Sequence, residues 1–173
     1  MSTPKKAIFL IDGSHYDRLR SVLETPFDLR KLGEIACKDA PIDSAIYFRD
    51  VRDDKEEERQ HSLFGWLKHN GFVVKGRAHH RDEPRERYGT NLVEMAIDGL
   101  LAADPGDHVI VMAADAKLAP LFSAFRDYGI ASTLISTLSA PVTIAPSPLL
   151  LDRTDRFIDV AGILPRIALE NAA

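Results

Sequence analysis

The fold class is decided by the stretch Lys6-Ala7-Ile8-Phe9-Leu10-Ile11-Asp12-Gly13-Ser14, in which a short apolar run ends on a carboxylate and a glycine. Apolar runs of this length that are rich in Ile and Phe are typical of a strand buried on both faces of a sheet. In an open parallel sheet, the carboxyl end of such a strand borders the ligand crevice. We therefore expect Asp12 either to take part in chemistry or to cap the following helix, with Gly13 in the turn.

Strand-like and helix-like segments alternate along the rest of the chain. Strands are expected at about residues 6–11, 45–48, 72–75, 108–112 and 130–136. Helices are expected at about residues 28–38, 53–70, 91–103 and 116–128. This alternation implies parallel strands joined by right-handed crossovers. We therefore predict an α/β protein, a three-layer α/β/α sandwich around a parallel five-stranded sheet in the order 3-2-1-4-5.

Length and composition favour one domain. The chain has 173 residues, of which 45% are hydrophobic and 28% charged, as in ordinary globular proteins. We expect residues 1–173 to form this domain, with a C-terminal tail of about residues 140–173 packed on it. The apolar anchors of the tail are Leu149-Leu150-Leu151 and Phe157-Ile158-Asp159-Val160.

Cysteine content, hydropathy and charge exclude several classes of protein. Cys37 is the only cysteine, which excludes a disulfide framework, and together with the lack of a signal-peptide pattern it predicts a cytoplasmic location. No apolar stretch approaches the ~20 residues that span a bilayer, so we expect no membrane partner. The net charge of -4 argues weakly against a dedicated nucleic-acid-binding surface of Lys and Arg. It does not argue against an acidic metal site that cuts nucleic acid.

The helix expected at residues 91–103 carries an unusual polar line. With residues at ~100° intervals, Asn91, Glu94 and Asp98 fall on one stripe about 60° wide, and the rest of the helix is apolar or small. This pattern predicts a largely buried helix. Buried carboxylates are costly, so they would need a metal, another cation or a wet cleft. The alternative is a solvent-facing stripe on a short helix.

A third acidic residue, Asp115, follows the strand at residues 108–112 by three positions and repeats the placement of Asp12. It too is expected either to cap a helix or to act in chemistry. In the order 3-2-1-4-5 the first and fourth strands are neighbours, so both carboxylates would face one crevice. Asn91 and Glu94 would lie near its mouth, with Asp98 about two turns of helix deeper. Such oxygen ligands suit Mg²⁺ or Mn²⁺, which can activate water at a phosphodiester.

The segment of residues 76–89 shows no periodicity and leans basic. Its arginines, among them Arg77 and Arg81, could hold phosphates beside the crevice, although a solvated loop of mixed charge is an equal alternative. His79 and His80 are adjacent in sequence, which is a poor geometry for two ligands of one metal. We expect both to be exposed.

These motifs together resemble the NYN domain, a branch of the PIN-like nucleases that includes the LabA-like proteins. That family's first strand ends in Asp-Gly-Ser-Asn, and here the sequence is Asp12-Gly13-Ser14-His15. Its middle helix begins Lys-Gly-Val-Asp and reaches a second Asp about two turns later, which resembles Tyr88-Gly89-Thr90-Asn91 followed by Asp98. Its fourth strand runs into Ser-Gly-Asp-x-Asp-Phe-x-Pro-Leu, where this chain has residues 113–121 with Asp115 and Lys117 at the two acidic positions. Its chain often ends in Ala-Asp-x-Phe-Ile, which resembles Thr154-Asp155-Arg156-Phe157-Ile158.

The resemblance implies a PIN-like (Rossmann-like) sheet and a Mg²⁺- or Mn²⁺-dependent ribonuclease that hydrolyses phosphodiester bonds of single-stranded or structured RNA. The catalytic residues and metal ligands it implies are Asp12, Asp98 and Asp115. We expect Glu94 as a further metal ligand, because it shares the polar stripe with Asp98. We expect substrate contacts from Ser14, His15, Asn91, Lys117, Arg77 and Arg81. The family pattern is broken where His15 replaces Asn, Asn91 replaces Asp and Lys117 replaces Asp.

Two other functions are open. In a catalytically degenerate NYN domain, Lys117 would form an ion pair among the carboxylates and make a metal unnecessary. Function would then come from RNA or protein partners and from a homodimer. A phosphotransfer protein is the weakest alternative, because Ser14 stands where a second Asp is characteristic. The side chain of Lys117 distinguishes the first two alternatives.

Overall fold

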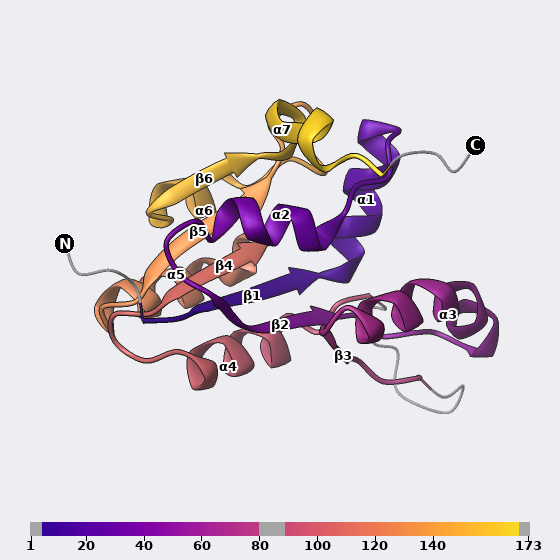
Figure 1. Ribbon diagram of the computed structural model, residues 1–173, viewed down its shortest axis with the longest axis horizontal. Coiled ribbons are helices and arrows are strands. Elements are labelled where there is room, and N and C mark those ends of the chain that lie inside the picture. Colours follow the sequence, from indigo (N-terminus) through magenta and orange to yellow (C-terminus); the bar gives the residue numbers. More distant parts are fainter. Residues whose placement is uncertain (1–4, 80–88, 170–173) are drawn as a thin grey trace.

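The fold is an α/β sandwich around a parallel sheet, given by a computed structural model that describes residues 5–79 and 89–169. The sheet order is β3-β2-β1-β4-β5-β6 (Figure 1). Its strands are β1 (Ala7–Asp12), β2 (Ile42–Phe48), β3 (Val73–Lys75), β4 (His108–Met112), β5 (Ala131–Ser136) and β6 (Arg156–Asp159). The predicted architecture and strand order are confirmed, but the described residues form six strands where five were predicted.

The additional strand, β6, lies parallel to β5 at the edge of the sheet, with Ser136 opposite Asp159. It has only four residues, and exposed Arg156 and half-buried Asp159 stand at its ends. So short a stretch carries almost no period-2 signal, and for that reason the sequence indicates only apolar anchors there.

Helices cover both faces of the sheet. One face carries α1 (Gly13–Leu23), α2 (Leu29–Ala36), α3 (Asp54–His69) and α7 (Val160–Ile167). The other carries α4 (Leu92–Ala102), α5 (Ala119–Asp127) and α6 (Pro148–Arg153), with the short 3-10 turn η1 (Ala116–Leu118) before α5. The sequence analysis places no helix at α1, α6 or α7. No helix in the described parts of the chain combines the length and the apolar character that crossing a membrane requires.

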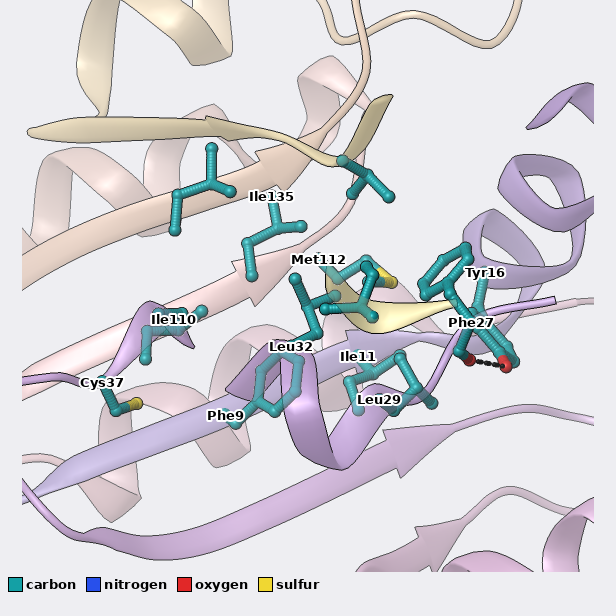
Figure 2. Close-up of a cluster of buried hydrophobic side chains, with 14 of the residues drawn as sticks. Phe9, Ile11, Tyr16, Phe27, Leu29, Leu32, Cys37, Ile110, Met112 and Ile135 are labelled. Atoms are coloured by element: carbon teal, nitrogen blue, oxygen red, sulfur yellow. Dashed lines mark hydrogen bonds between the residues drawn. The ribbon is translucent and has the colours of Figure 1, made fainter. Parts of the chain in front are cut away.

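The residues of β1 alternate between the two cores. Phe9 and Ile11 contribute to the cluster beneath α1 and α2, whereas Ile8 and Leu10 pack beneath α4 and α5. Figure 2 shows the first cluster, in which the hydroxyl of Tyr16 also donates a hydrogen bond of 3.1 Å to the carbonyl of Phe27. A strand buried on both faces is the structure that its continuous apolar run predicts.

The predicted burial of α4 is wrong. Its outer face exposes Val93 (69%), Ile97 (52%) and Leu101 (81%). Met95 and Gly99 are its residues buried against the sheet, and Leu92, Ala96 and Leu100 pack there only partly buried. A Cβ on Gly99 would lie 2.7 Å from a methyl group of Leu10, so glycine allows the helix to approach β1 closely. The helix is apolar on its exposed side as well, and hydropathy alone therefore cannot identify its inner face.

The sheet register decides where the candidate site lies. Ile11 is paired with Tyr47 of β2 on one side and with Met112 of β4 on the other. Because all these strands are parallel, the segments that follow them emerge at the same edge. Asp12, Arg49 and Ala113 are thereby brought to one edge of the sheet from distant parts of the chain.

Candidate functional site

Asp12 lies at the centre of this edge and is 2% exposed. Its Oδ1 accepts hydrogen bonds from the backbone N–H of His15 (3.1 Å) and from the hydroxyl of Thr90, so it does cap α1. Arg18 Nη2 lies 3.9 Å from its Oδ2. Burial raises the pKa of Asp12 above its usual value, although the hydrogen bonds from Thr90 and His15 and the charge of Arg18 oppose the rise. This carboxylate combines a capping role with a perturbed environment, which is common at functional sites.

A chain of polar contacts connects Asp12 to α3. The hydroxyls of Thr90 and Ser14 lie 3.3 Å apart, and Arg49 Nη1 donates to Ser14 Oγ at 2.8 Å. The other end of the Arg49 guanidinium meets Glu56 Oε1 at 2.9 Å. The hydrogen bond from Thr90 to Asp12 is not predicted from the sequence, and neither is the role of Arg49. The signal for Arg49 is its place directly after β2, at the edge where Asp12 lies.

Asp98 is held by a lysine. Lys75 Nζ, at the end of β3, lies 2.7 Å from Asp98 Oδ2. The side chains are 39% and 19% exposed, respectively. Glu94 is half-buried, and exposed Asn91 caps α4 by accepting a hydrogen bond of 3.1 Å from the N–H of Glu94. The predicted polar line therefore exists, but its deepest carboxylate already has a cation.

Asp115 and Lys117 are both exposed. Asp115 Oδ1 accepts a hydrogen bond of 2.9 Å from the backbone N–H of Lys117 and so caps η1. The Lys117 side chain forms no ion pair with any carboxylate of the described residues. The lysine that reaches the acidic residues is thus Lys75, and the Lys117 ion pair of the second alternative is not formed among the described residues.

His15 is completely buried. Its Nε2 lies 2.8 Å from Ser136 Oγ, and its Nδ1 meets no hydrogen-bonding group within the described parts of the chain. Burial, with a smaller effect of the Arg18 charge, lowers the pKa of His15 to about 3. A buried neutral ring offers no surface for the substrate contact expected of this residue.

The basic segment after β3 is described only in part. Arg77 is exposed, and its backbone N–H donates to Asp50 Oδ1 at 3.0 Å. His79 is buried with its Nε2 2.9 Å from Asp50 Oδ2, so the predicted exposure of His79 is wrong. His80 and Arg81 lie outside the described residues.

A pocket of about 330 Å³ is lined by Arg18, which also faces Asp12, and by Asp115. Arg18 and Asp115 form its polar side, and residues 142–145 with Ser147 form the opposite wall. The wall is attached to the end of β4 because Ser147 N donates to the carbonyl of Ala114 at 3.1 Å. No function is predicted from the sequence for residues 137–147.

The residues as placed do not fit a divalent metal. In the described parts of the chain, no group of three or more His, Cys, Asp or Glu side chains is arranged to hold one. The carboxylates that would bind a metal already have partners. Asp98 pairs with Lys75, and Asp12 accepts a hydrogen bond from Thr90 and faces Arg18. A nearby positive charge competes with a cation for the same carboxylate oxygens.

Comparison with known proteins gives a family and a related fold. The NYN domain family matches this chain over residues 6–164. Among solved structures, the chain is similar to a protein of unknown function from Vibrio parahaemolyticus, with 20% sequence identity and a TM-score of 0.74. The similarity covers 92% of this chain and 95% of the other. No curated protein matches the chain.

Proposed function

This chain belongs to the NYN domain family of PIN-like nucleases, and we propose that it uses the nuclease-like scaffold to bind RNA, with a lysine in place of a divalent metal. The observation that carries the proposal is the ion pair between Lys75 and Asp98, at 2.7 Å. Proteins of this family generally use divalent metals. Here the ammonium group of Lys75 already pairs with the carboxylate that the resemblance assigns to metal binding.

Replacement of a metal by a lysine changes what the site can do. An ammonium group can attract a phosphate and donate hydrogen bonds to it, but it has no open coordination position at which water is activated. The remaining site residues are suited to holding rather than cleaving. Ser14 and Thr90 bring hydroxyls to the edge, and Arg49 holds Ser14 in place.

Exposed cations at the edge support RNA as the ligand. The side chains of Arg18 and Lys75 are 45% and 39% exposed, and Lys117 is exposed as well. Exposed cations attract the phosphates of a single strand without reading its sequence. The small number of such cations among the described residues agrees with modest affinity and with the net charge of -4.

The test combines a metal titration with RNA binding. A site that bound Mn²⁺ with a Kd of about 10 μM would stabilise the native state by about 2.7 kcal/mol at 1 mM metal, and would raise the Tm by about 5–10 °C. We expect no such rise in the wild type. We expect a labelled single-stranded oligoribonucleotide to bind equally with Mn²⁺ and with EDTA.

Lys75→Met is the informative variant, and Lys68→Met, which removes an exposed lysine on α3, is its control. If Lys75 takes the place of a metal, its removal frees Asp98 and creates a Tm rise with Mn²⁺ that the control lacks. A Tm rise in the wild type, or RNA binding that is lost in EDTA, would contradict the proposal.

A metal-dependent ribonuclease is the second candidate. It is favoured by the positions of Asp12 and Asp115 after neighbouring strands, because Mg²⁺ often takes only one or two carboxylates besides substrate phosphates. In that case Asp12→Asn abolishes RNA cleavage in Mg²⁺ or Mn²⁺ while the protein stays folded. Equal cleavage by wild type and variant would sink this candidate.

A further inference from the structure

The pocket lined by Arg18 and Asp115 is closed by residues 142–145 and Ser147, which have no role in the function described so far. Arg18 connects the pocket to Asp12, because its guanidinium lies 3.9 Å from Asp12 and also lines the pocket. Asp115 faces the same space. A volume of about 330 Å³ is at the lower end of the range of ~300–1,000 Å³ for small-molecule sites. It is large enough for one nucleotide unit but not for a duplex.

The donors of Arg18 are available to a ligand. Its one ion pair within the described residues is the distant one to Asp12, at the outer limit for such a pair. The fork of N–H donors on a guanidinium matches two oxygens of a phosphate. The side chain is nearly half exposed, so a phosphate can reach it without opening the fold.

The opposite wall supplies hydroxyls and apolar surface. Thr143 and Ser147 are its polar residues, and Ile144 and Val142 are apolar, with Val142 almost fully exposed at the rim. The wall is held in shape by a turn in which Ile144 N and Ala145 N both donate to the carbonyl of Pro141 at 2.8 Å. Apolar surface that stays exposed in a built wall is suited to the flat face of a base or to a sugar.

We propose that this pocket binds a single ribonucleotide unit of an RNA strand, with its phosphate on Arg18 and its sugar hydroxyls on Asp115. The inference rests on the proposed function and adds to it a subsite of defined chemistry. Asp115 Oδ1 already accepts from Lys117 N, whereas Oδ2 has no hydrogen-bond donor among the described residues and can accept from a ribose hydroxyl. A 2′-hydroxyl contact distinguishes RNA from DNA.

The experiment measures binding of three probes by the full chain: a labelled eight-nucleotide oligoribonucleotide, the deoxy form of the same sequence, and 5′-AMP. Arg18→Gln removes the phosphate contact, and Thr143→Trp fills the pocket from an exposed position. Arg30→Gln, which removes an exposed arginine on α2, is the matched control. Thermal melting checks that each variant is folded.

We expect Arg18→Gln and Thr143→Trp each to weaken oligoribonucleotide and AMP binding by about 10-fold or more, which is typical of a lost charge-assisted contact. The control keeps wild-type affinity, and the deoxy probe binds the wild type less tightly than the ribose probe. Oligoribonucleotide binding that is unchanged in both pocket variants overturns the subsite but leaves the proposed function standing. AMP binding that depends on the pocket, without oligoribonucleotide binding, would show a mononucleotide site and would overturn both the RNA subsite and the proposed function. Failure of the wild type to bind either probe overturns both.

Discussion

At the scale of single residues, burial shifts the pKa values of two groups at the edge of the sheet. Asp12 and His15 belong to the same turn, and burial acts on them in opposite directions because it disfavours whichever form is charged. The pKa of Asp12 is raised and that of His15 is lowered. Each shift makes the stability of the fold depend on pH in a predictable direction.

Asp12→Asn should leave the Tm at pH 7 unchanged or raise it. Above pH 3.8 the native carboxylate ionises less readily than the unfolded one, so its ionisation lowers stability as the pH rises. Asparagine removes this cost and can still accept from Thr90 and His15 N. Melting at pH 4 and pH 7 checks the sign, because the advantage of the variant should be smaller at pH 4. At about 2–4 °C per kcal/mol the change is measurable. Unfolding of the variant at both pH values would show that the charged cap is essential.

His15→Gln should make the free energy of unfolding fall less steeply as the pH is lowered below 6.5. In the wild type the unfolded state binds a proton below pH 6.5, whereas the native ring stays neutral down to about 3. Stability is therefore complete above pH 6.5 and falls with decreasing pH, by at most about 1.4 kcal/mol per pH unit from this residue. Urea unfolding between pH 4 and 7 measures the slope. A slope as steep in His15→Gln as in the wild type would contradict the buried neutral histidine.

At the scale of elements, the turn from β1 into α1 is the most constrained connection. Gly13 begins α1 directly after the strand, with no linker. A Cβ at this position would lie 2.7 Å from the carbonyl oxygen of Phe48 and equally close to the ring of Tyr47. The glycine that follows Asp12 is thus required by contact with β2 and not only by the turn.

Gly13→Ala is therefore expected to destabilise the fold by about 1–3 kcal/mol, the usual cost of overpacking. The neighbouring atom is backbone, so a rotamer change cannot relieve the contact. Gly65→Ala is the control, since a Cβ there meets nothing within 4 Å and alanine favours helix. Thermal melting of both variants measures the effect. Equal Tm values for Gly13→Ala and Gly65→Ala would mean that β1 and β2 can separate without cost.

At the scale of the whole molecule, function depends on the meeting of segments at one edge of the sheet. Residues near positions 12–18, 75, 90–98, 115 and 142–147 contribute to the candidate site or its pocket. The overall charge of -4 opposes binding of a polyanion, and among the described residues a few exposed cations at this edge counteract it. RNA binding should thus be local and weakly dependent on salt.

The affinity for a single-stranded oligoribonucleotide should fall by about 10-fold between 50 and 200 mM salt. Two to three phosphate contacts, with a slope of about -0.7 per contact, give a change of this size. Fluorescence anisotropy at several salt concentrations measures the slope. A fall of a thousandfold or more would require many more phosphate contacts than this edge provides.

The amino-acid sequence by itself determined the fold class, the strand order and the positions of the central strands. Long apolar runs such as that of β1, and the alternation with helices, are local signals that tertiary packing does not reverse. The two carboxylates after β1 and β4 were also predictable, because the end of a buried strand is marked in the sequence. Short elements such as β6 and α6 were not, since four to six residues carry too little periodicity.

Only the tertiary structure decided which polar side chains meet at the site. Lys75 and Asp98 are 23 residues apart, and Thr90 and Asp12 are 78 apart, so neither pairing follows from local spacing. The exposure of one face of α4, the burial of His15 and the pocket wall at residues 142–147 likewise depend on how helices pack on the sheet. Such contacts are set by the register of distant strands, and this is the physical reason that the chemistry of the site could not be derived from its motifs alone.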